Sequence, residues 1–77
     1  MNTATLIIIP GTGARSVILS DNMNVAQLIR RENLHGRDII INGSGVLAAN
    51  FETTIIPNGS EVFATGSVKG NSGRPSE

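Results

Sequence analysis

The residues of this sequence that could carry out chemistry are few and lie far apart. His35 is the only histidine, and the sequence contains no cysteine. A catalytic histidine needs a nucleophile beside it, and a zinc site needs several His or Cys ligands at short spacing. His35 has no such neighbour, so we predict no catalytic residue, no metal site and no cofactor. We expect that the protein is not an enzyme.

The glycines of Gly11-Thr12-Gly13 have the spacing with which some phosphate-binding loops begin. Those loops need a third glycine or a Lys-Ser or Lys-Thr pair, and a helix has to follow them. Here the β-branched stretch 15–19 follows instead. We therefore interpret residues 10–13 as the turn of a β-hairpin.

Arg30, Arg31, His35 and Arg37 form a local basic cluster near the end of a predicted helix. Two interpretations are open. The cluster is either a solvated helix end, where the helix dipole favours positive charge, or a contact site for an acidic partner. We keep Arg30, Arg31 and Arg37 as candidate partner-binding residues.

The composition excludes several classes of function. The 77 residues include six basic and six acidic side chains, and there is no Tyr or Trp. Such a chain is unsuited to binding nucleic acid, which requires positive charge and is aided by aromatic stacking. The apolar run Leu6–Ile9 is too short for a membrane span or a signal peptide. We expect one small cytoplasmic domain with no nucleic-acid or membrane partner.

The clearest local pattern in the sequence is the start of a helix, which would carry Arg30 and Arg31. Asn24 can cap a helix, and Gln27 completes a capping box. Met23 and Leu28 are placed to pack against each other across the cap. The pattern predicts a helix that begins directly after Asn24 and is ended by Asn33 through Gly36, where Gly36 suits the left-handed position that closes many helices.

Short β-branched segments that end at turn residues indicate strands. They cover 3–9, 15–19, 38–41, part of the less regular stretch 46–51, and 61–65 with an extension to Val68 left open. The unbroken apolar run in the first segment predicts a central strand that is buried on both faces. From Gly70 on there is no apolar residue, so we expect a disordered tail.

Two stretches of the chain resemble each other. Residues 39–46 and 55–62 both contain Ile-Ile followed by Asn-Gly-Ser and, two positions later, Val. A stacked repeat protein needs three or more units. We therefore interpret the two copies as turns that use the same chemistry.

One helix across one face of a four- or five-stranded mixed sheet is the simplest way to bury these apolar stripes. The first and last strands would then be parallel neighbours at the centre of the sheet. We predict an α+β fold of the β-grasp type over residues 1–69, followed by a tail over 70–77.

This order of elements resembles that of ubiquitin-like β-grasp proteins, and the second half is similar to the small sulfur carriers of thiamin and molybdopterin synthesis. The segments that carry the resemblance are Val25–Asn33, Ile41–Gly43 and Ile56–Val62. The resemblance implies a protein that contacts partners through its sheet face. The carriers end in a Gly-Gly pair whose carboxylate is activated. This chain has Lys69-Gly70-Asn71 at that place and no adjacent pair of glycines.

A single helix can cover only one face of the sheet, which leaves apolar residues on the other face exposed. Isoleucines occupy both faces of the strand predicted at 38–41. We predict that Ile39, Ile41 and Phe63 form an apolar patch that binds a partner. The alternative is that a loop or a second copy of the chain buries them.

Three functions agree with this sequence. The first is a non-catalytic ubiquitin-like protein-binding module, an adaptor or modulator that docks through its open sheet face. The second is a divergent sulfur carrier or protein modifier that acts after processing of its C-terminus. The third is a small structural subunit or decoration protein of a larger assembly, for instance a viral one. We expect a protein partner, and self-association stays open.

Overall fold

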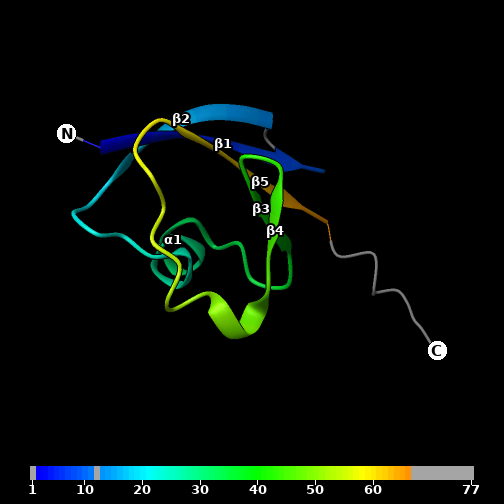
Figure 1. Ribbon diagram of the computed structural model, residues 1–77. Helices are drawn as coiled ribbons and strands as arrows, with labels where there is room; N and C mark the ends of the chain where they lie inside the picture. Colours follow the sequence, from blue (N-terminus) through cyan, green and yellow to red (C-terminus); the bar gives the residue numbers. More distant parts are fainter. Residues whose placement is uncertain (1, 12, 67–77) are drawn as a thin grey trace.

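Five strands, one helix and one 3₁₀ turn follow one another along the chain (Figure 1). The computed structural model describes residues 2–11 and 13–66. The strands are β1 (Asn2–Ile9), β2 (Gly13–Leu19), β3 (Asp38–Ile41), β4 (Ser44–Val46) and β5 (Ser60–Thr65); the helix is α1 (Val25–Glu32), and the 3₁₀ turn spans Ala48–Asn50. The predicted extension to Val68 and the predicted tail lie outside the described residues.

The strands form one mixed sheet in the order β2-β1-β5-β3-β4. β1 and β5 run parallel, and the other three pairs are antiparallel. The predictions of an α+β domain and of parallel first and last strands are confirmed. The prediction that β1 is buried on both faces is wrong, because its residues alternate. Leu6 and Ile8 are buried, whereas Ile7 is half-buried and Ile9 is 53 % exposed.

The backbone donors at the start of α1 are satisfied inside the protein. Asn24 Oδ1 accepts from Gln27 N at 2.8 Å, and Gln27 Oε1 accepts from Asn24 N at 3.0 Å, so the predicted capping box is confirmed. The N–H groups of Val25 and Ala26 donate to carbonyl oxygens in the segment 51–54, both at 3.0 Å. These bonds fix the helix start against the segment that leads towards β5.

The helix ends directly after Glu32, at the start of the predicted terminating stretch Asn33 through Gly36, but the cap residue differs from the predicted one. Asn33 is the residue that takes the left-handed conformation (φ 58°, ψ 53°), and its N–H donates to Ile29 O. The prediction that Gly36 closes the helix is therefore wrong. Asparagine is the residue that most readily replaces glycine at this position. Gly36, with φ 81°, lies in the turn before β3.

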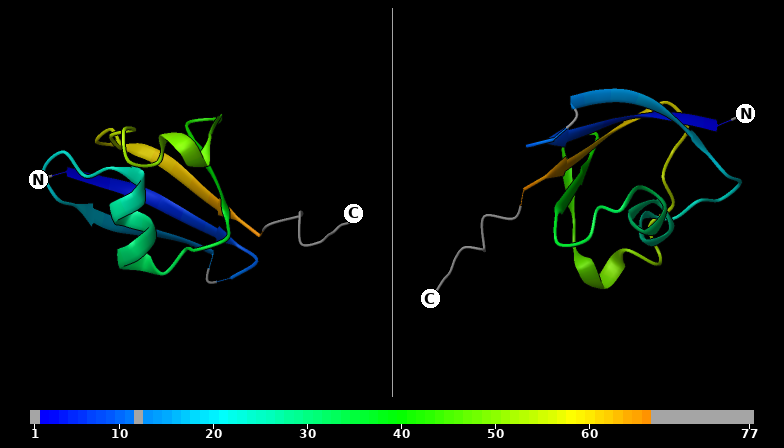
Figure 2. Two further views of the ribbon diagram at one scale, coloured as in Figure 1. Left: turned by 90° about the horizontal axis from the view of Figure 1, so that it is seen from below. Right: turned by 180° about the vertical axis from the view of Figure 1, so that it is seen from behind.

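α1 packs on one side of the sheet (Figure 2). Val25, Leu28 and Ile29 are the buried residues of the helix. On the sheet, alternate residues of each long strand contribute to the same core, namely Ala4, Leu6, Ile8, Val17, Leu19, Ile39, Ile41, Val62 and Ala64. The two-residue period of a strand therefore gives each of these strands a core side and an outer side.

The asparagines of the two Asn-Gly turns make the same kind of side-chain hydrogen bond, although the backbone of Asn42 is left-handed (φ 49°) and that of Asn58 is not. Asn42 follows β3, and its Oδ1 accepts from the backbone N–H of Glu61 in β5 at 3.0 Å. Asn58 precedes β5, and its Oδ1 accepts from the backbone N–H of Thr3 in β1 at 2.9 Å. Each asparagine thus satisfies a backbone donor on the strand next to it in the sheet. Together the two turns hold β5 in register between β1 and β3.

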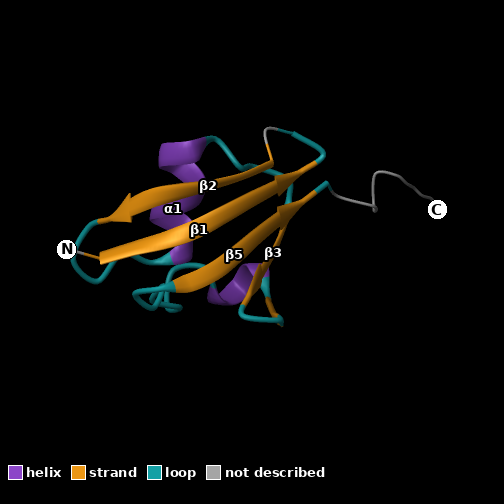
Figure 3. Ribbon diagram, turned by 90° about the horizontal axis from the view of Figure 1, so that it is seen from above, coloured by secondary structure: helices purple, strands orange, loops and turns teal. Residues whose placement is uncertain are grey.

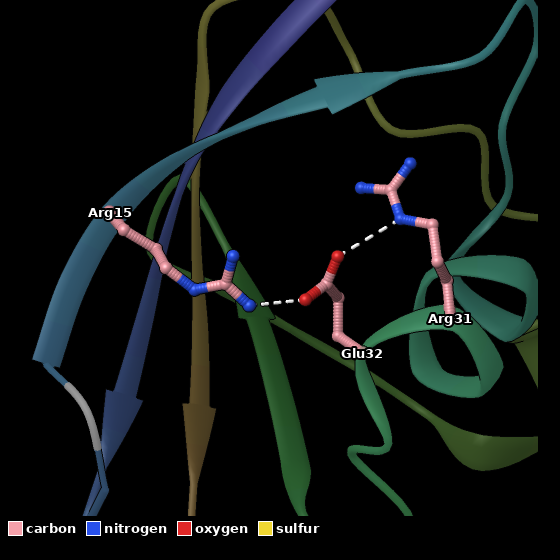
Figure 4. A network of polar contacts seen from close by, with 3 residues as sticks. All are labelled: Arg15, Arg31 and Glu32. Carbon is pink, nitrogen blue, oxygen red and sulfur yellow. Dashed lines mark hydrogen bonds and ion pairs between the residues drawn. The ribbon is translucent and has the colours of Figure 1, made fainter.

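A carboxylate at the end of α1 joins the helix to the edge strand β2 (Figure 4). Glu32 accepts hydrogen bonds from Arg15 of β2 and, at 3.0 Å, from Arg31 Nε. Its side chain is 14 % exposed. Burial alone would raise the pKa of Glu32, but the hydrogen bonds and positive charges of the two arginines outweigh it and lower the pKa.

We predict that Glu32 contributes to stability at neutral pH and not in acid. A carboxyl whose pKa is lowered by folding stabilises the folded state above its unfolded-state pKa, and this contribution is lost as the pH falls through the folded-state pKa. Urea unfolding should therefore show Glu32→Gln less stable than the wild type at about pH 7, with the two proteins converging at about pH 3. A stability difference that is equal at both pH values would contradict this role.

The turn before β5 gives a second prediction. Asn58→Ala removes the hydrogen bond to Thr3 and should lower the free energy of unfolding by about 0.5–1.5 kcal/mol. Asn50→Ala is the matched control, because the Asn50 amide makes no hydrogen bond to any described residue. It should change stability by less than about 0.5 kcal/mol in the same urea titration. Equal losses in the two variants would show that the turn does not hold β5.

Candidate functional site

The side of the sheet that faces away from α1 is the open face. Figure 3 shows β2, β1, β5 and β3 side by side in front, with the helix behind them. No described helix or loop crosses this side of the sheet in that view. The open face is thus a surface that the described part of the fold leaves without a layer over it.

An apolar row crosses the open face from strand to strand. The register pairs Ile7 of β1 with Phe63 of β5, and Phe63 with Ile40 of β3. Ala14 of β2 extends the row beyond Ile7, and Gly45 of β4 ends it beside Ile40. Ile7, Phe63 and Ile40 are half-buried, because neighbours on one face of a sheet pack against each other. We call Ala14, Ile7, Phe63 and Ile40 the apolar row.

Mostly polar side chains border the apolar row on both sides, with the exposed Ile9 as the exception. One bordering row consists of Ser16, Thr5 and Glu61, all exposed. The other consists of Ile9, Thr65 and Asp38. An apolar centre inside a polar rim is the usual layout of a protein–protein interface.

The predicted patch of Ile39, Ile41 and Phe63 is placed correctly for one residue and wrongly for two. Phe63 lies on the open face. Ile39 and Ile41 are 2 % and 8 % exposed and belong to the core. Three consecutive isoleucines do not reveal which of them faces outward. Pairing with β5 decides it, because Ile39 lies beside the buried Ala64. Ile40 is therefore the outward residue.

The arginines of the predicted basic cluster lie in different surroundings. Arg30 and His35 line a hollow of about 450 Å³ between α1 and the 3₁₀ turn, together with Glu52. Arg31 takes part in the ion-pair network at the helix end. Arg37 lines another hollow, and its buried Nη1 has no hydrogen-bond partner among the described residues. Since they do not line one feature, a role of Arg30, Arg31 and Arg37 in partner binding stays a prediction.

Sequence reasoning missed several exposed or outward-facing apolar residues. Ile7 and Ile40 belong to the apolar row, and only the strand register reveals their outward direction. Leu47, 71 % exposed, and Ile55, 49 % exposed, line a hollow of about 380 Å³ beside the edge strand β4. Both lie in irregular segments, where no periodicity of the sequence can indicate which side chains are exposed.

The described residues offer no constellation for metal chemistry or membrane crossing. Within 2–11 and 13–66, no three His, Asp or Glu side chains are grouped so that they could hold a metal ion. No helix in the same part of the chain is long and apolar enough to cross a membrane.

No protein-family model matches the sequence, and neither a curated protein nor a solved structure gives a significant match. What the open face can bind therefore has to follow from its own geometry and chemistry.

Adjacent isoleucines of β3 provide a direct test of the two faces. Ile39→Thr places a hydroxyl in the core and should lower the free energy of unfolding by about 2–4 kcal/mol. Ile40→Thr keeps a β-branched residue on the open face and should cost less than about 1 kcal/mol. Thermal and urea unfolding of both variants measure the difference. Equal losses, or a larger loss for Ile40→Thr, would overturn the assignment of the faces.

Proposed function

We propose that this protein is a non-catalytic binding module of the ubiquitin-like β-grasp type, an adaptor or modulator that docks onto a partner protein through the open face. Three features support the β-grasp assignment: the parallel pair β1 and β5 inside the sheet, an antiparallel hairpin at each edge, and one helix across a single face.

The observation that carries the proposal is the apolar row. Folding does not require Ile7, Phe63 and Ile40 to be apolar, because their side chains lie on the side of the sheet opposite the core. Threonine or tyrosine would serve equally well in strands at these positions. Contiguous apolar surface on a folded domain usually marks a place where a partner binds.

The shape of the open face favours a protein partner over a small ligand. Small molecules bind in concave sites that enclose most of their surface. Three hollows of the described chain lie beside α1, β4 and the 3₁₀ turn, and Ile7, Phe63 and Ile40 line none of these three. A broad face with an apolar centre is suited to a second macromolecular surface of about 800 Å².

The two other functions considered from the sequence have no specific support in the described structure. Carrier chemistry would depend on Lys69-Gly70-Asn71, which lie outside the described residues. A structural subunit would also bury the open face, but nothing in the described residues points to a particular assembly.

Capture of a partner tests the proposal. The double variant Ile40→Thr/Phe63→Thr removes two side chains of the apolar row. Each side chain is worth about 1 kcal/mol or more when an interface buries it, so together they should weaken a complex at least about tenfold. Tagged wild-type protein and the double variant are compared as baits in extract of the source organism, with quantitative mass spectrometry.

The matched control is Ile55→Thr, which makes a similar substitution at an exposed isoleucine away from the open face. We expect proteins that are retained by the wild type and by Ile55→Thr and lost with the double variant. Retention by all three baits would refute docking through the open face. Circular dichroism at the capture temperature confirms that each bait is folded.

A further inference from the structure

Among the described residues, the charged side chains on the outward rows of the sheet are acidic. Glu61 and Asp38 stand on its two bordering rows, and Glu61 is exposed. The arginines of the described chain are elsewhere. Arg15 lies on the core side of β2 and reaches Glu32, Arg30 and Arg31 belong to α1, and Arg37 lines a hollow with Leu47 and Phe51. Among the described residues, the open face therefore presents apolar, neutral polar and acidic side chains and no arginine.

This charge pattern disfavours a second copy of the chain as the face-to-face occupant. A symmetric dimer brings the same patch of both subunits together. The open faces would then bring the exposed Glu61 carboxylates of both copies into one interface, with no described arginine on the open face of either copy. Like charges brought together in an interface are unfavourable, whereas opposite charges select the right partner and speed its association.

The positions of Glu61 and Phe63 also set the distance between a basic group and an apolar group of the partner. Glu61 and Phe63 are two residues apart on β5 and point to the same side, so their side chains start about 7 Å from each other along the strand. A basic group that pairs with Glu61 must therefore lie about 7 Å from an apolar group that packs on Phe63. Residues two apart in an extended segment, or four apart in a helix, meet this condition.

We propose that the occupant of the open face is a basic segment of another protein, a proposal that rests on the docking function proposed above. It carries an apolar anchor that packs on Ile7, Phe63 and Ile40, and a lysine or arginine about 7 Å from this anchor that pairs with Glu61. The apolar row supplies affinity, and Glu61 selects the charge of the partner.

The test is selection of peptides from a random library displayed on phage, with the full-length protein as the immobilised target. Wild-type protein should enrich peptides that contain an apolar residue with Lys or Arg two or four positions away. Affinities of the enriched peptides are then measured with three variants by fluorescence polarisation. Glu61→Lys should weaken binding about tenfold and Phe63→Thr at least tenfold.

The third variant, Glu52→Lys, is the control for net charge. Glu52 is an exposed carboxylate that lines the hollow beside α1, away from the open face. Glu52→Lys should bind the enriched peptides within about twofold of the wild type, and about 0.5 M salt should remove most of the difference between Glu61→Lys and wild type.

The outcomes separate this proposal from the docking function on which it rests. Enriched peptides that depend on Phe63 but show no preference for basic residues would overturn the proposal and leave the docking function standing. Peptides that do not depend on Phe63, or a failure to enrich any, would overturn both. Sedimentation equilibrium that shows a dimer broken by Phe63→Thr would instead assign the face to a second copy and also overturn the proposal.

Discussion

The position of β5 is the constraint on which the rest of this structure depends. The last strand lies between β1 and β3: all of its residues pair with β1, and the residues from Val62 to Thr65 also pair with β3. Because side chains of a strand alternate, fixing β5 in register fixes both faces of the sheet at once. Val62 and Ala64, both 0 % exposed, face the core, and Phe63 between them must face outward. A shift by one residue would exchange these roles.

The hydrogen bonds of the two Asn-Gly turns explain how this register is held. Asn42, which follows β3, accepts a hydrogen bond from Glu61 N near the start of β5. Asn58, which precedes β5, accepts one from Thr3 N of β1. These bonds act at the end of β5 where its pairing with β1 begins. The same constraint that builds the core thus also lines up Ile7, Phe63 and Ile40 on the other face. Since that row lies on the side of the sheet opposite the core, we propose that its apolar character serves binding.

The parts of the fold that the sequence predicts are those specified by nearby residues. The capping box of Asn24 and Gln27 is local, and so are the strand boundaries at Asp38 and Ile41, which the structure confirms. The failures arise where distant residues decide. Three isoleucines in a row show no alternation of apolar and polar residues, so the sequence does not tell which of them faces the core. Only the pairing with β5 shows it, which is why Ile40 was missed and Ile39 and Ile41 were misplaced. Helix closure failed for a local reason, since either Asn33 or Gly36 can adopt a left-handed conformation. The polar border of the open face emerges only from the pairing of β1, β2 and β5.

The most direct test of the apolar row is the solvent exposure of isoleucine methyl groups in solution. Methyl-labelled protein is titrated with a soluble gadolinium chelate, which broadens the NMR signals of exposed methyl groups. The structure predicts that the methyl signals of Ile7 and Ile40 broaden several-fold more than those of Ile8, Ile39 and Ile41. Equal broadening of Ile39 and Ile40 would contradict the strand register. Protection of Ile7 and Ile40 to the level of Ile8 would show that the open face is already covered.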